Sequence, residues 1–148
     1  GGKTYAIGKI GDIFSMRNID FNFTGTDLDL MDQLQKQIEC AEDGSLIFAN
    51  FVEFDSLFGH RRDPTGYAKA LEWFDNEIAS VVRNLLEDDL LIITADHGND
   101  PTWSGTDHTR EQVPVLIKGK ADLIQSGIEF RDVAELASKH LGVAIPEP

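Results

Sequence analysis

Cysteine is nearly absent from this sequence, in which Cys40 is the single one among 148 residues. A lone thiol cannot form an internal disulfide, so we expect the chain to work in a reducing compartment, which predicts a cytoplasmic location. Long apolar runs are missing as well, because no segment approaches the roughly 20 apolar residues of a membrane-spanning helix. We therefore expect no membrane partner.

Positive charge is also scarce. The sequence contains 13 Lys and Arg residues against 26 Asp and Glu residues, which gives a formal net charge of −13 at pH 7. Nucleic acids are bound by positively charged surfaces, so this balance argues against a nucleic-acid partner and suits a site that binds cations. The hydrophobic content of 41% agrees with a globular protein of one domain that has a real core.

Short apolar runs alternate with amphipathic segments along the chain. This order predicts an α/β fold in which a mostly parallel sheet is flanked by helices. The runs at 90–93 and 113–117 are interpreted as buried strands, and the segment from Asn18 to Thr26 as a linker. The other expected elements are strands within 4–14 and 45–52, a helix over 27–42, a helix that begins at Pro64 with Asp63 as its N-cap, and a final helix from Phe130 to Leu141.

Acidic and histidine residues follow two of the predicted strands. Asp55 and His60 come after one strand, Asp96 and His97 come after another, and His108 lies further along the second loop. Ligands of open α/β sheets bind beyond the carboxyl ends of the strands, so these side chains are expected to share one crevice. Five N and O ligands are the set of a two-metal site from which one or two ligands are missing.

A single Asp-His pair is weak evidence, because such a pair after a strand is more often a turn with a hydrogen-bonded histidine. The metal interpretation therefore depends on finding two such sets. Carboxylate and imidazole ligands suit Mn²⁺, Zn²⁺ or Fe²⁺, and ligand type alone does not choose among them.

Arg61 and Arg62 lie beside His60 and allow two interpretations. One is a solvated arginine pair. The other is a contact to a phosphate or to a structural carboxylate, because guanidinium groups bind oxyanions in a bidentate manner.

Three longer motifs stand out, FGHRRD at 58–63, TADHGNDPT at 94–102 and GTDHTRE at 105–111. They resemble those of the phosphopentomutases, a family of the alkaline phosphatase superfamily. A more distant member of the superfamily would share the Asp-His-Gly element but not its NDPT continuation or the GHRRD block. The resemblance runs from YAIGKI at 5–10 to the last predicted helix and implies that the chain is part of an alkaline-phosphatase-like core.

Phosphopentomutases are isomerases that interconvert ribose 1-phosphate and ribose 5-phosphate, or the deoxyribose equivalents. They use two Mn²⁺ ions and a phosphorylated threonine. Matched motif by motif, the resemblance implies that Asp55, His60 and His108 hold one ion. It implies that Asp96 and His97 hold the other ion together with ligands from elsewhere in the enzyme.

Further roles are also implied by the resemblance. Lys9, in the Gly-Lys-Ile run, would contact the phosphate of the sugar, although its sequence context alone is that of a surface lysine. Asp100, Asp107 and Thr109 would orient the histidine ligands. Residues 1–26 would be a strand and linker from the junction of cap and core, and 27–148 the carboxy-terminal part of the metal-binding core domain.

Phosphopentomutases are considerably longer than this chain, and their amino-terminal part carries an aspartate ligand and the phosphorylated threonine. Neither has a counterpart here, so no catalytic nucleophile is predicted, and the chain alone is expected to be inactive. The expected partners are pentose phosphates, the missing amino-terminal portion and a second copy of the chain, because a partial core exposes a sheet edge. The alternatives are an enzyme like cofactor-independent phosphoglycerate mutase and a non-catalytic metal-binding or interaction module.

Overall fold

The computed structural model describes residues 2–119 and 128–145. They belong to two compact units, of which the first comprises Gly1–Leu85 and Asn99–Thr109 and the second Leu86–Gly98 and Arg110–Pro148. The first unit contains β1 (Thr4–Ile7), α1 (Ile10–Ile13), β2 (Phe21–Phe23), α2 (Asp27–Cys40), β3 (Leu46–Ala49), the π-helix η1 (Phe54–Gly59) and α3 (Pro64–Asn84). The second unit contains β4 (Leu91–Thr94), β5 (Val115–Lys118) and α4 (Phe130–Leu141).

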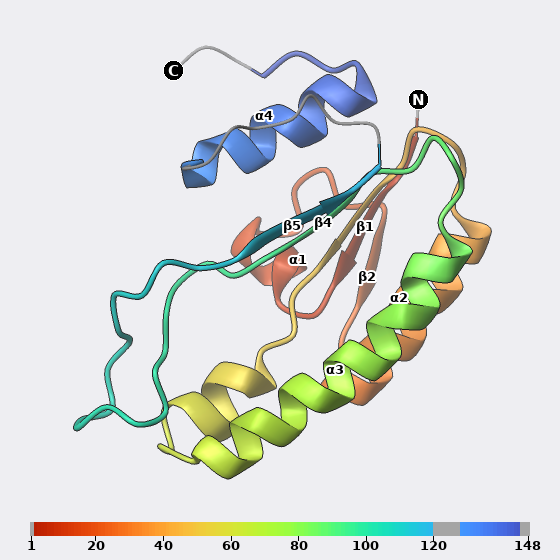
Figure 1. The fold of residues 1–148 in the computed structure, drawn as a ribbon. Coiled ribbons are helices and arrows are strands. Elements are labelled where there is room, and N and C mark those ends of the chain that lie inside the picture. The colour runs from red at the N-terminus through yellow and green to blue at the C-terminus, as the bar shows by residue number, and fades with distance from the viewer. Residues whose placement is uncertain (1, 120–127, 146–148) are drawn as a thin grey trace. The chain divides into compact units, whose positions relative to one another are not determined.

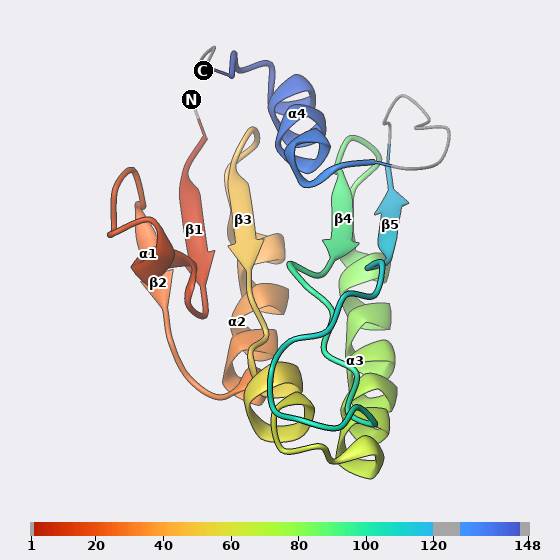
Figure 2. The same cartoon turned by 90° about the vertical axis from the view of Figure 1, so that its left-hand side faces the viewer.

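The first unit is built on a three-stranded sheet with the order β2-β1-β3, and β1 runs parallel to both neighbours. Tyr5 of β1 is paired with Phe21 on one side and with Ile47 on the other. Helix α2 covers one face of this sheet and α1 lies on the opposite face (Figures 1 and 2). The predicted α/β fold with a mostly parallel sheet flanked by helices is confirmed.

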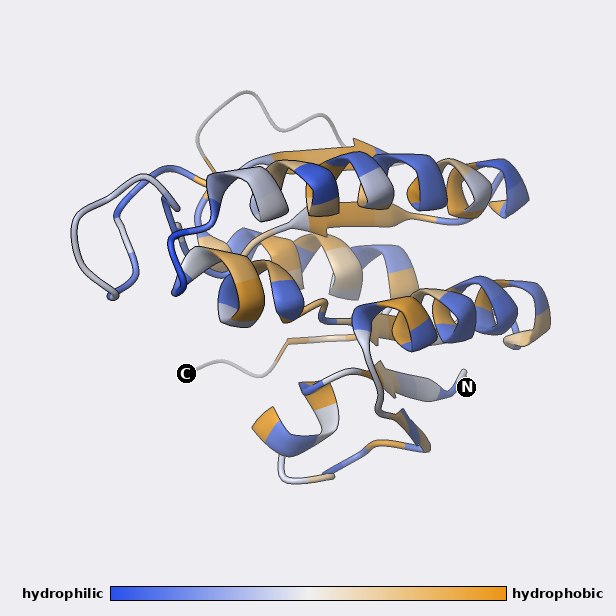
Figure 3. Cartoon of the chain, turned by 90° about the horizontal axis from the view of Figure 1, so that it is seen from below, coloured by the Kyte–Doolittle hydropathy of each residue, from blue (hydrophilic) through white to orange (hydrophobic). Residues whose placement is uncertain are grey.

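The core of the first unit lies between β1 and α2. Ala6 and Ile7 of β1 are completely buried, and Leu30 and Met31 of α2 are 1% exposed. Burial of each large apolar side chain contributes about 1.5–3 kcal/mol, so this seam holds the sheet and helix together. Figure 3 shows hydrophobic and hydrophilic residues alternating on the helices, as amphipathic packing requires.

Local capping explains where the two long helices begin. Thr26 and Asp29 form a reciprocal capping box at the start of α2, in which the hydroxyl accepts from the Asp29 N–H and the carboxylate accepts from the Thr26 N–H. Asp63 accepts a hydrogen bond of 2.9 Å from the Gly66 N–H, and Pro64 is the first residue of α3. The predicted start of α3 is confirmed.

Two expectations for individual strands were wrong. The segment interpreted as a linker contains the strand β2, which pairs with β1. This pairing joins two separate segments, so the local sequence pattern did not indicate it. The runs expected as buried strands of a parallel sheet form an antiparallel pair, β4 and β5, in which Leu116 is 60% and Ile117 38% exposed. The connection between them has no crossover helix, and parallel neighbours would need one.

No helix within the described residues is long and apolar enough to cross a lipid bilayer.

Asp27, the first residue of α2, is a buried carboxylate that connects this helix to the segment entering η1. It accepts hydrogen bonds of 3.1 Å from the backbone N–H groups of Val52 and Glu53. Burial raises the pKa of Asp27 to about 6 and the charge of Glu53 adds to this, although the two backbone hydrogen bonds oppose it.

We expect the substitution Asp27→Asn to remove a pH dependence of stability. Because the pKa of Asp27 is about 6 in the folded chain and lower when unfolded, the folded state binds more protons between about pH 4 and 6. The free energy of unfolding of the wild type, minus that of the variant, should therefore fall as pH rises through this window, by up to about 3 kcal/mol. Urea unfolding of the metal-free proteins at several pH values measures this difference. A difference that stays constant or rises would contradict the prediction.

Candidate metal centre

The site is centred on η1, the π-helix that follows β3. Asp55 is its second residue and His60 directly follows its end. Phe54 packs edge-on against Tyr67 and Phe74 of α3, with ring centroids 5.8 and 5.9 Å away, so η1 is anchored on that helix. π-helical turns are rare and often found at functional sites, and this one turns its carboxylate toward the histidine that follows.

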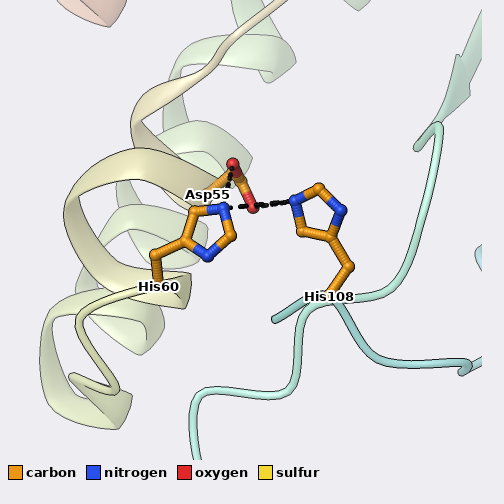
Figure 4. A group of neighbouring side chains, drawn as sticks. All are labelled: Asp55, His60 and His108. Carbon is orange, nitrogen blue, oxygen red and sulfur yellow. Dashed lines mark hydrogen bonds and ion pairs between the residues drawn. The ribbon is translucent and has the colours of Figure 1, made fainter. Parts of the chain in front are cut away.

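Three predicted ligands of the first unit meet at this point. The Nε2 atom of His60 lies 3.2 Å from Oδ2 of Asp55, and that of His108 lies 3.5 Å from Oδ1. The two Nε2 atoms are 3.2 Å apart. Figure 4 shows the Asp55 carboxylate facing both rings, His60 coming from the end of η1 and His108 from a loop distant in sequence.

The backbone fixes the tautomer of His60. Its Nδ1 atom lies 2.5 Å from the carbonyl oxygen of Thr106, so this nitrogen carries a proton and donates to the carbonyl. In the neutral ring, Nε2 then offers a lone pair that faces an oxygen of Asp55. Two lone pairs at this distance repel each other unless a proton or a metal ion lies between them.

The spacing of the three groups fits a metal ion. One ligand atom from each residue lies within 4.8 Å of the others. Two ligands bound about 2.1 Å from an ion with tetrahedral angles are about 3.4 Å apart, which is close to the separations found here. The side chains are 32% (Asp55), 38% (His60) and 47% (His108) exposed, so an ion can reach them from solvent.

Asn99 supports the carboxylate of this group and was not identified from the sequence. Its Nδ2 atom donates a hydrogen bond of 2.5 Å to Oδ1 of Asp55. Gly59 makes room for this contact, because a Cβ atom at that position would lie 2.4 Å from the Asn99 amide nitrogen. Asn99 occurs in the NDPT continuation that distinguished the motif, and this is the signal that could have pointed to it.

Comparison with known proteins adds an independent observation. The profile of the metalloenzyme superfamily matches residues 2–144 of this chain. The chain belongs to the metalloenzyme superfamily.

Several curated relatives of this metalloenzyme chain carry the name phosphopentomutase. That of Actinobacillus succinogenes is 46% identical over 147 residues, which cover 97% of this chain and 37% of the relative. Those of Sinorhizobium fredii and Rhizobium meliloti are 49% and 48% identical, with 36% and 37% of their lengths covered. The chain thus spans little more than a third of these relatives, and the resemblance found in its motifs is confirmed.

The other two predicted ligands of the metalloenzyme lie in its second unit. Asp96 is exposed and His97 is half-buried, and the Nε2 atom of His97 lies 3.7 Å from Oδ1 of Asp96. The Nδ1 atom of His97 lies 3.3 Å from the carbonyl oxygen of Gly98. They form a neighbouring pair at the end of β4, and their assignment as ligands stays a prediction.

The remaining candidates have different outcomes. Lys9 is exposed at the N-terminus of α1, and its role stays a prediction. The carboxylate of Asp100 accepts hydrogen bonds from the N–H and the hydroxyl of Thr102, and these bonds lower its pKa. Asp100 therefore shapes the loop and does not orient a histidine as expected.

Burial, and then the charge of Asp55, raise the pKa of Tyr67, so this phenol beside the site stays neutral.

Arg62 is not the solvated side chain of the first interpretation, and a contact to phosphate stays a prediction. Its guanidinium donates to backbone carbonyls and to the side-chain oxygen of Asn99, and it pairs with no carboxylate among the described residues. Most of these acceptors come from a loop that is remote in sequence, which is why the sequence did not reveal them.

We expect His60→Ala to weaken Mn²⁺ binding by the chain by more than about 100-fold. Loss of a partner that only supports a ligand costs 10- to 100-fold in affinity, and loss of a ligand should cost more. Loss of the free-ion EPR signal during a Mn²⁺ titration measures the affinity. His140→Ala is the matched control, because His140 is exposed near the end of α4. Equal affinities of the two variants would contradict the assignment.

Proposed function

We propose that this chain supplies part of the metal-binding core of a phosphopentomutase, an isomerase acting on ribose or deoxyribose phosphates. The relatives with this name match nearly the whole chain, and the chain spans about 37% of the Actinobacillus succinogenes protein. The chain would be a carboxy-terminal portion of the enzyme. Its partners would then be the rest of the enzyme and pentose phosphates.

The observation that carries the proposal is the convergence of Asp55, His60 and His108. Three ligand atoms face one point, and the Thr106 carbonyl leaves the Nε2 lone pair of His60 directed toward it. A carboxylate with two imidazoles suits Mn²⁺, and the net charge of −13 favours cations generally.

The resemblance assigns the rest of the site. Asp55, His60 and His108 would hold one Mn²⁺ ion, while Asp96 and His97 would hold a second ion together with an aspartate and a threonine from outside this chain. When bound, the two ions would supply positive charge that neutralises phosphoryl oxygens and favours an in-line transfer.

The chain's own residues have binding and orienting roles in this scheme. Lys9 would contact the phosphate of the sugar, and the Asn99 amide holds the Asp55 carboxylate in a fixed orientation toward the ion. The nucleophile would be the threonine outside the chain. The chain alone therefore lacks the group that receives the phosphoryl group and should be inactive.

A chimera tests the proposed activity. This chain replaces the matching 147 residues of the Actinobacillus succinogenes relative. The purified chimera should convert ribose 1-phosphate to ribose 5-phosphate with Mn²⁺, as followed by phosphorus NMR, while the chain alone should not. His60→Ala in the chimera should lower the rate by more than about 100-fold, because a ligand of one ion is lost.

His140→Ala is the control for the chimera, because His140 lies on the exposed side of α4. A folded chimera that binds Mn²⁺ but acts on no pentose phosphate would overturn the proposal. Activity on phosphoglycerate would instead favour the sister branch of mutases.

A further inference from the structure

Arg62 is bound to five acceptors that surround the candidate metal centre. Its Nη1 atom donates to the carbonyls of Gly59 and Asp100, at 3.1 and 2.8 Å, and to Oδ1 of Asn99 at 2.6 Å. Its Nη2 atom donates to the carbonyl of Asp107 at 2.6 Å, and its Nε atom donates to the carbonyl of Gly105. One side chain thus joins the end of η1 to the loop 99–109.

Arginine is suited to this task because of the shape of its guanidinium group. It offers five N–H donors in a rigid plane, so it can satisfy acceptors that approach from several directions. A lysine ammonium offers three donors from a single atom and cannot reach all five acceptors. The backbone of Arg62 is in the left-handed region with φ of 53°, a strained conformation that persists only where other contacts compensate for it.

The residues that Arg62 contacts are bonded to, or adjacent to, residues that hold each of the three candidate ligands. Asn99 accepts from Arg62 through its oxygen, which leaves its Nδ2 group to donate to Asp55. The carbonyls of Gly105 and Asp107 flank Thr106, whose own carbonyl accepts from His60. Asp107 also directly precedes the third ligand, His108.

We propose that Arg62 is a positioning residue that assembles the Asp55, His60 and His108 ligands before the metal ion binds. The proposal rests on the proposed function of these three residues as a metal site. Arg62 acts by holding the loop 99–109 against η1 and by fixing the amide of Asn99. Its hydrogen bonds within the described residues go to carbonyl and amide oxygens, so its proposed role is to hold the candidate ligands in place and not to bind the ion itself.

The first experiment compares Arg62→Lys and Arg62→Ala with Arg61→Lys, the matched control. Arg61 is an exposed neighbour of the same residue type. Both Arg62 variants should bind Mn²⁺ about 10- to 100-fold more weakly in EPR titrations, the usual cost of losing a group that orients ligands. Arg61→Lys should bind like the wild type. Unchanged affinity in folded Arg62→Ala would overturn the proposal.

Hydrogen exchange of the metal-free chain tests the assembly separately from the metal. The N–H groups of Asp100, Thr102 and Trp103 are hydrogen-bonded within the loop, to Thr109 Oγ1, Asp100 Oδ1 and the Asp100 carbonyl. They should exchange faster in both Arg62 variants, while the amides of α2 should keep their rates. Equal loop exchange in wild type and variants would overturn the proposal.

The Mn²⁺ titration and the hydrogen-exchange experiment together distinguish failure of the metal site from failure of the positioning role. If the wild-type chain binds no Mn²⁺, the metal site of the proposed function fails, and the exchange of the loop amides still decides whether Arg62 assembles it. If the wild type binds Mn²⁺ and the Arg62 variants bind it equally well, only the positioning role fails.

A double-mutant cycle tests the path through Asn99. Asn99→Ser shortens the side chain, so Asp55 loses its amide donor while Arg62 is intact. If Arg62 acts on Asp55 through Asn99, the double variant with Arg62→Lys should weaken Mn²⁺ binding by less than the product of the two single effects. Independent effects would contradict this path.

Chemical rescue separates positioning from general stabilisation of the fold. Added methylguanidinium should restore Mn²⁺ affinity to Arg62→Ala but leave Arg61→Lys unchanged. If Arg62→Ala does not fold, the folded Arg62→Lys variant and the Asn99 cycle decide the proposal. Failure of rescue in folded Arg62→Ala, combined with unchanged loop exchange, would assign Arg62 no positioning role.

Discussion

The hydrogen bond between His60 and the Thr106 carbonyl is the contact on which the site depends. It ties the end of η1 to the loop 99–109 and leaves the Nε2 lone pair of His60 directed at Asp55. A histidine without this contact could rotate or adopt the other tautomer. The convergence of the ligands therefore depends on an ordinary backbone carbonyl that lies far away in sequence.

The site consists of partly exposed side chains next to a closely packed core. The seam of β1 and α2 is closely packed, and Asp27 connects the start of α2 to the segment that enters η1. The candidate ligands lie on η1, directly after it and on a loop, where they are partly exposed. In such an arrangement, ions from solvent can reach side chains whose positions are fixed by the packed core of the first unit.

The residues of the candidate metal centre could be predicted from the sequence, but their supporting contacts could not. His60 and His108 lie in the motifs that carried the family resemblance, Asp55 lies three residues before the first of them, and the structure brings the three together. The sequence offered a solvated Arg62 or a contact to an oxyanion, and it did not reveal that this side chain donates to carbonyl oxygens. Carbonyls occur at every residue, so a sequence gives no sign of which one a guanidinium will meet.

The sequence by itself determined the features that depend on near neighbours. Thr26 and Asp63 cap helices within three residues of themselves, and the helical spacing of apolar residues defined α2, α3 and α4. Tertiary structure alone decided the strand β2, the antiparallel pairing of β4 with β5, the tautomer of His60 and the partners of Arg62. The physical reason is that these contacts join segments far apart in the chain, and their energies depend on how the whole backbone folds.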